Sequence, residues 1–141
     1  MKKVIAIILI VTGVAGVLYV AHGWTLRHAD EKVAKFNRDC DSLIMGIQQY
    51  KEFVGSYPTG NNAAVTKALL GQTGEKKVLI LAVRRADMND KGELVDPWGT
   101  PLQFYFSHNE VLIRSAGPNK VWEDSAIPTA DDLYRCTGKE K

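Results

Sequence analysis

The acidic residues near the C-terminus are the side chains best suited to chemistry in this sequence. Glu123 and Asp124 are followed by Asp131 and Asp132, shortly after Asn119, in an irregular segment. A hard cation such as Ca²⁺ takes about six to eight oxygen ligands, and a flexible loop rich in carboxylates can supply them. The spacing is not that of an EF-hand, and a solvated acidic loop explains the same charge pattern. The residues alone leave both interpretations open.

Two cysteines form the second candidate site. Cys40 and Cys136 make no C-x-x-C motif, so neither a zinc site nor a redox dithiol is indicated. In an exported domain a disulfide between them would join the N-terminal helix to the C-terminal end. Two separately buried thiols are the alternative, because free cysteine behaves as a small hydrophobe.

Catalytic motifs are missing from the sequence. The three histidines have no nucleophile or carboxylate at motif spacing, and neither a glycine-rich phosphate loop nor a His-Glu-x-x-His occurs. The formal net charge is +2, with acids and bases interspersed, which argues against a nucleic-acid partner. We therefore expect no catalytic residues, no enzymatic activity and no nucleic acid.

A rigid turn is predicted where Asp96, Pro97, Trp98 and Gly99 are followed by a second proline. We expect Trp98 to be a large apolar anchor that fixes this turn to the core. An exposed Trp98 would instead offer a platform for a peptide or a sugar. A tryptophan that holds a loop onto its domain is the more common case.

The elements that position these residues begin with a long helix, predicted over residues 4–54. Its second half is amphipathic, because apolar residues recur at steps of three and four and therefore share one helix face. These residues are Val33, Phe36, Cys40, Leu43, Ile47, Tyr50 and Val54. Ile44 widens this face beyond a coiled-coil seam, so we expect it to pack on a sheet.

Shorter elements are predicted after the long helix. Asn61 or Asn62 caps a helix over residues 63–70. Alternating apolar and polar residues predict an antiparallel hairpin over residues 102–115. Periodicity cannot assign the apolar run 78–83 to helix or strand, and residues 116–141 are expected to form a loop and tail.

The N-terminal segment predicts a membrane anchor. Residues 4–21 are apolar and uncharged, and as a helix they would extend about 27 Å, enough for a thin bilayer. The preceding lysines favour a cytoplasmic N-terminus. We therefore expect an anchor over residues 1–23 and an extracytoplasmic head domain over residues 24–141. Small residues at positions 21 and 23 also fit a cleaved signal peptide, so that alternative stays open.

Four segments occur in an order and spacing that are informative together. They are Tyr57-Pro58-Thr59-Gly60, Asp96-Pro97-Trp98-Gly99-Thr100-Pro101, Ser115-Ala116-Gly117-Pro118-Asn119 and Ala130-Asp131-Asp132-Leu133. Over about residues 33–135 the chain thus resembles the major (G-type) pseudopilin of type II secretion systems, a type IV pilin-like family. The resemblance implies an α+β fold, in which a long N-terminal helix with a membrane part and an amphipathic part packs on a small antiparallel sheet.

The resemblance also implies a function, partners and a cofactor. The chain would be a structural subunit in the bacterial inner membrane, with residues 4–21 in lipid, the N-terminus cytoplasmic and the head periplasmic. Its partners would be other pseudopilin or secretion-system subunits, or further copies of itself. The family commonly binds Ca²⁺ after the hairpin, which here implies Asp131 and Asp132 as ligands. Asn119 stands where the family has an aspartate, and Glu123 and Asp124 would compensate for the lost charge.

One departure from the family favours a different function. Pilin precursors carry a Gly-Phe-Thr-Leu-x-Glu signature whose glutamate enters the apolar segment, but residues 4–21 contain no glutamate or other charged side chain. The similar letters at residues 23–28 lie after the apolar run and have His28 in place of the glutamate. The alternative is therefore a membrane-tethered module that does not polymerise and uses the head for binding.

Overall fold

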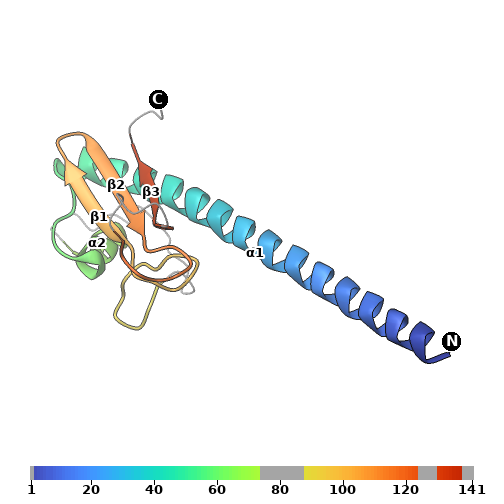
Figure 1. Ribbon diagram of the computed structural model, residues 1–141. Helices are drawn as coiled ribbons and strands as arrows, with labels where there is room; N and C mark the ends of the chain where they lie inside the picture. The colour runs from blue at the N-terminus through green and yellow to red at the C-terminus, as the bar shows by residue number, and fades with distance from the viewer. Residues whose placement is uncertain (1, 74–87, 124–129, 138–141) are drawn as a thin grey trace. The chain divides into compact units, whose positions relative to one another are not determined.

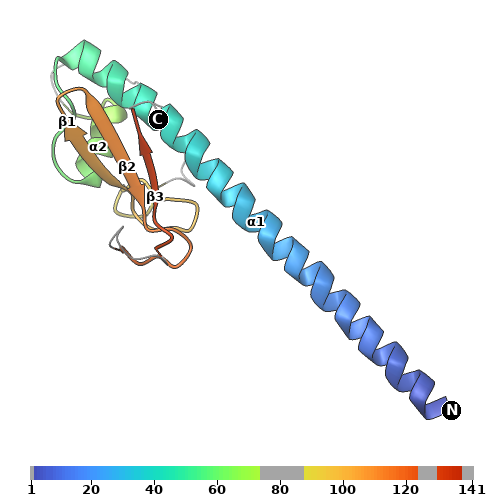
Figure 2. The same cartoon turned by 45° about the horizontal axis from the view of Figure 1, so that its top comes forward.

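The computed structural model describes the backbone of residues 2–73, 88–123 and 130–137, with side chains from residue 27 onward. Within these ranges the fold is α+β (Figure 1). The helices are α1 (Lys2–Val54) and α2 (Asn62–Leu69), and the strands are β1 (Gln103–Ser107), β2 (Glu110–Ser115) and β3 (Leu133–Cys136). The sheet is antiparallel, with β2 between β1 and β3 (Figure 2).

The chain divides into two units, Met1–Ala34 and Lys35–Lys141. The first unit consists of the N-terminal part of α1. The predicted anchor, residues 4–21, lies outside the described side chains and stays a prediction, as does the domain boundary between residues 23 and 24. Where side chains are described, no helix combines the length and the apolar character needed to cross a bilayer.

The core of the second unit contains the amphipathic part of α1. Its buried residues there are Phe36, Cys40, Leu43, Ile44 and Ile47, all of which the apolar pattern predicts. They form one cluster with Val65 and Leu69 of α2 and with Val111 and Ile113 of β2. The amphipathic part of the helix therefore contacts both α2 and the sheet.

The predicted apolar face ends earlier than the pattern indicates. Val33 and Tyr50 are only half-buried, and Val54 is 41% exposed. Val54 is the last residue of α1, and Gly55 follows with a φ of 93° and a hydrogen bond from its amide to Lys51 O (2.8 Å). The helix ends at this residue, and the side chain of Val54 is left exposed.

Two neighbouring asparagines start α2 and hold it in place. Asn61 is the N-cap, and its side chain accepts a hydrogen bond from Ala64 N (3.0 Å). The Asn62 amide nitrogen donates to Leu94 O (2.9 Å) and Leu102 O (2.7 Å), while its oxygen accepts from Leu94 N (2.7 Å). Asn62 therefore joins α2 to the chain on both sides of the 96–99 turn.

That turn is fixed by a carboxylate. Asp96 is 4% exposed, and its Oδ1 accepts hydrogen bonds from the amides of Trp98 (2.9 Å) and Thr100 (2.8 Å). Its Oδ2 accepts from Ser115 Oγ on β2 (2.6 Å). Trp98 is half-buried and does not belong to the core cluster of the described residues. Asp96 thus joins the turn to β2 by hydrogen bonds, and the anchoring role expected of Trp98 stays a prediction.

The predicted hairpin is confirmed, and one strand was missed. Strands β1 and β2 pair from Gln103↔Arg114 to Ser107↔Glu110, which leaves residues 108 and 109 as the turn. The prediction of a loop and tail is wrong for β3, which pairs with β2 from Ser115↔Leu133 to Leu112↔Cys136. A four-residue strand carries too little alternation to be recognised locally, and β2 supplies its hydrogen-bond partners. The run 78–83 lies outside the described residues.

We predict that Asn62→Ala lowers the free energy of unfolding by about 2–3 kcal/mol, because buried backbone groups lose their partners. Chemical denaturation of the full chain, followed by circular dichroism, measures the change. Gln48→Ala removes an exposed amide on α1 and is the control, expected to change stability by no more than about 0.5 kcal/mol. An Asn62→Ala effect as small as the control would contradict the role of Asn62.

Candidate metal centre

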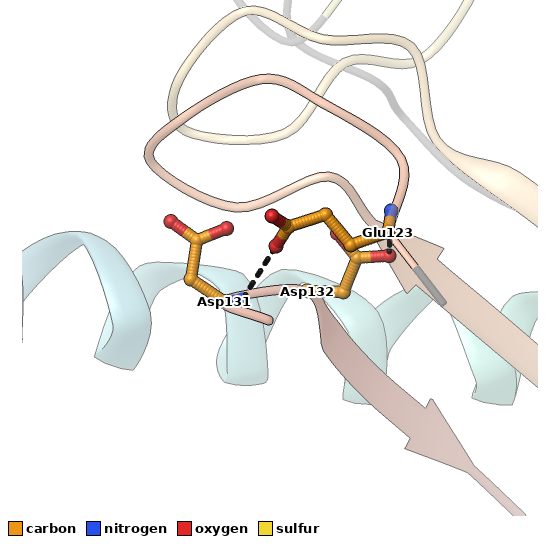
Figure 3. Close-up of side chains that lie close together, drawn as sticks. All are labelled: Glu123, Asp131 and Asp132. Carbon is orange, nitrogen blue, oxygen red and sulfur yellow. Dashed lines mark hydrogen bonds between the residues drawn. The ribbon is translucent and has the colours of Figure 1, made fainter. Parts of the chain in front are cut away.

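Three carboxylates gather where the chain leaves β2 and enters β3. Each of Glu123, Asp131 and Asp132 offers one oxygen that lies within 4.8 Å of the other two (Figure 3). The sheet register explains the cluster, because Ser115 at the end of β2 pairs with Leu133 at the start of β3. The residues that follow one strand and precede the other are thereby brought together.

Each carboxylate is held by one of its oxygens. Asp131 Oδ2 accepts a hydrogen bond from the amide of Asn119 (3.2 Å), Glu123 Oε2 from that of Asp131 (3.0 Å), and Asp132 Oδ2 from that of Glu123 (3.3 Å). Figure 3 shows the last two of these bonds.

The remaining aspartate oxygens, Asp131 Oδ1 and Asp132 Oδ1, are buried and have no hydrogen-bond partner. Buried polar atoms are normally paired, so two unpaired carboxylate oxygens in one cluster require an explanation. A bound cation would satisfy both, and carboxylate oxygens are ligands that a hard cation takes, so the cluster could hold such an ion.

A glycine allows the segment after β2 to approach the cluster closely. Gly117 has a φ of 65°, and a Cβ at this position would clash with the backbone carbonyl and carboxylate of Asp131. Only glycine accommodates both the left-handed backbone and this close approach. The segment after β2 is consequently packed directly against the backbone of Asp131.

An arginine completes the cluster from the sheet. Arg114 on β2 donates from Nε to Asp132 Oδ2 (2.6 Å), and its Nη2 contacts both Asp132 Oδ2 and Glu123 O. The Asp132 side chain is 1% exposed and that of Arg114 is 18% exposed. Burial lowers the pKa of Arg114, but the hydrogen bond and attraction of Asp132 outweigh it, so the net shift is upward. With three carboxylates and one guanidinium, the cluster has a formal charge of −2, which a divalent cation would neutralise.

The predicted ligand set and the cluster agree in part. Asp131 and Asp132 lie in the cluster, whereas Asp124 lies outside the described residues. Asn119 is exposed, and its side-chain oxygen accepts from Val121 N (2.7 Å), so its amide N–H supports Asp131 instead. Glu123 also lies in the cluster, although the predicted ligand set did not include it. Arg114 was missed, since only the pairing of β3 with β2 reveals which acid it meets.

The side chains of Cys40 and Cys136 lie on opposite sides of the sheet. Arg135 donates to the Asp41 carboxylate of α1 from Nε (2.8 Å) and from a terminal nitrogen (3.2 Å). Because side chains alternate along a strand, Cys136 points away from the helix. Cys40 is 1% exposed in the core, Cys136 is exposed, and no disulfide joins these two described residues. The predicted bridge is not formed here, and Cys136 is not the buried thiol of the alternative.

Burial, reinforced by the charges of Asp39 and Asp41, raises the pKa of the Cys40 thiol to about 12. Thiolate is the reactive form of cysteine, so a thiol with such a pKa is almost entirely unreactive near neutral pH. Cys40 is accordingly a structural residue of the core.

No family model, curated protein or solved structure matches the chain.

We predict that Ellman's reagent at pH 8 labels Cys136 of the native full chain and leaves Cys40 protected until denaturation. The deciding cause is the burial and raised pKa of Cys40. Cys136→Ser should abolish the native reaction, and Cys40→Ser should leave it unchanged. If no thiol reacts before reduction, even in denaturant, the cysteines form a disulfide and this assignment is wrong.

Proposed function

We propose that this chain is a structural pseudopilin-like subunit of a type II secretion or type IV pilus-like assembly. In this proposal the N-terminal helix anchors it in the bacterial inner membrane and the head lies in the periplasm. The observation that carries the proposal is that three of the four segments resembling the family contact one another in series, while the first packs on the hairpin.

These contacts form a series. Tyr57 of the first segment stacks on Phe106 of the hairpin, with ring centroids 5.2 Å apart. Asp96 of the second segment accepts the 2.6 Å hydrogen bond from Ser115 of the third. The third meets the fourth through Gly117 and Asn119, both against Asp131. The second, third and fourth segments are thus linked in series, and the first packs on the hairpin, an arrangement that is compatible with the resemblance.

The packing of α1 supports the finer, pilin-like fold that we propose. The amphipathic part of the helix shares a buried cluster with β2. At its end, Lys51 Nζ donates to His108 O (2.7 Å) and Asn109 Oδ1 (2.9 Å) in the hairpin turn. Lys51 Nζ also lies 4.3 Å from the centre of the Tyr57 ring. The helix thus contacts the sheet through apolar side chains of residues 36–47 and its hairpin turn through the ammonium group of Lys51.

We further propose that Glu123, Asp131 and Asp132 bind Ca²⁺. The unpaired buried oxygens of the two aspartates support this assignment. The ion would join Glu123, in the segment after β2, to Asp131 and Asp132, which directly precede β3. It would thereby hold β3 in the sheet. Its role would be to stabilise the head, since all three residues serve as ligands and none is placed to act on a substrate.

The alternative, a tethered module that does not polymerise, is favoured by one specific observation. The apolar segment 4–21 has no glutamate to pair with the amino terminus of a neighbouring subunit. In this case the anchor and the head would be kept, and the head would bind a partner without forming a filament.

We predict that Ca²⁺ raises the melting temperature of the full chain relative to EGTA, by roughly 10 °C at a hundredfold excess over Kd. Asp132→Asn should abolish the shift because it removes a ligand charge. Asp90→Asn changes an exposed acid in another turn and should retain the shift. Equal melting temperatures of the wild type in Ca²⁺ and EGTA would exclude the calcium proposal.

We predict that chemical crosslinking of membranes containing the tagged full chain gives a ladder of multimers. Mass spectrometry of the N-terminus should show that residues 4–21 are retained. A retained N-terminus with monomer alone would favour the tethered module. A mature chain beginning at Trp24 would exclude membrane anchoring by this segment and thus both proposals.

A further inference from the structure

We propose that Arg114 is an internal counter-cation of the acidic cluster formed by Glu123, Asp131 and Asp132. It holds Glu123 and Asp132 together without metal, and it lowers the affinity of the cluster for a divalent cation. The inference rests on the proposed cation site at Glu123, Asp131 and Asp132. It concerns how that site is regulated by a residue that is not itself a ligand.

Arg114 connects two parts of the segment between β2 and β3. Its guanidinium contacts the carboxylate of Asp132, just before β3, and the backbone carbonyl of Glu123, on the segment after β2. This is the same pair of segments that a cation at the cluster would join. Arg114 therefore already provides part of the stabilisation that a metal ion would provide.

Arg114 and a metal ion would use different oxygens of Asp132. The guanidinium binds Oδ2, whereas Oδ1 is buried without a partner. Binding of the ion does not require Arg114 to leave, so both positive charges would be present together. The arginine acts by its charge, and it does not block the site.

Two aromatic rings hold the guanidinium in place. Its central carbon lies 5.1 Å from the centre of the Trp122 ring and 5.4 Å from that of Tyr134. Cation–π contacts of this kind stabilise a partly desolvated arginine and restrict its movement. The charge consequently stays beside Asp132 when a second cation approaches.

Charge then determines the direction of the effect. A fixed guanidinium repels a divalent ion a few ångströms away, and in a partly buried site water screens this repulsion weakly. The number of ligand charges is a main determinant of calcium affinity. Removing Arg114 changes the formal charge of the cluster from −2 to −3, so the variant should be less stable without metal and should bind metal more tightly.

The test uses Arg114→Gln in the full chain, with calorimetric titration of Ca²⁺ and melting temperatures in Ca²⁺ and in EGTA. We expect the melting temperature in EGTA to fall by about 5 °C. We expect the Kd for Ca²⁺ to fall about tenfold, with saturating Ca²⁺ restoring most of the lost stability. Arg114→Lys keeps the charge without the forked geometry, so it should lower the melting temperature while keeping the wild-type Kd.

Arg135→Gln is the matched control. It removes an arginine–aspartate pair between β3 and α1, away from the cluster. It should lower the melting temperature equally in both buffers and leave the Kd within about twofold of wild type.

Three results would overturn the inference. Weaker Ca²⁺ binding by Arg114→Gln would make Arg114 a residue that positions Asp132. An equal loss of stability in both buffers with an unchanged Kd would make it an ordinary ion pair. A Kd for Arg114→Lys that falls as far as that for Arg114→Gln would exclude an effect of charge.

The same titrations separate this inference from the calcium proposal. Binding by Arg114→Gln but not by the wild type would support the counter-cation and overturn the calcium proposal for the natural chain. Binding by both with equal Kd would leave the calcium site intact and overturn the role of Arg114. Binding by neither would overturn both.

Discussion

The fold of the second unit depends on one apolar interface, between the amphipathic part of α1 and the inner face of the sheet. Ile47 of α1 and Ile113 and Val111 of β2 are fully buried there, and Leu69 of α2 joins them. Burial of a large aliphatic side chain contributes about 1.5–3 kcal/mol. A small head has few such residues, so this interface cannot by itself order the irregular segments around it.

Polar side chains order those segments. Asn62 lies on a helix, Arg114 on a strand and Asp96 in a turn. The side chain of each connects an irregular segment to a regular element. Each also makes several hydrogen bonds in a partly or fully buried setting, where hydrogen bonds are strong and unpaired groups are costly. The head is thus built from a few apolar contacts that bring its elements together and a few polar contacts that determine how the chain runs between them.

This division explains what the sequence could and could not predict. The local sequence pattern identified the buried face of α1, a cap at Asn61 or Asn62 and the β1–β2 hairpin, because these depend on residues close in sequence. It missed β3, whose pairing comes from β2, and it overextended the apolar face to Val54, where the helix ends. At the site, Asp131 and Asp132 were found through the resemblance, whereas the connection between Arg114 and Asp132 depends on a strand register that no local pattern contains.

The connections within the sheet also set the order in which it can form and open. Strands β1 and β2 are joined by the two-residue turn at His108 and Asn109, while β2 and β3 are separated by residues 116–132. Closing the longer connection has the larger entropic penalty, and β3 is a short strand at the sheet edge. We therefore expect the β1–β2 hairpin to form before β3 pairs with β2, and β3 to detach before the hairpin opens. Arg114 and any bound cation would then act on this local opening equilibrium, leaving the helix and hairpin folded while the C-terminal strand attaches and detaches.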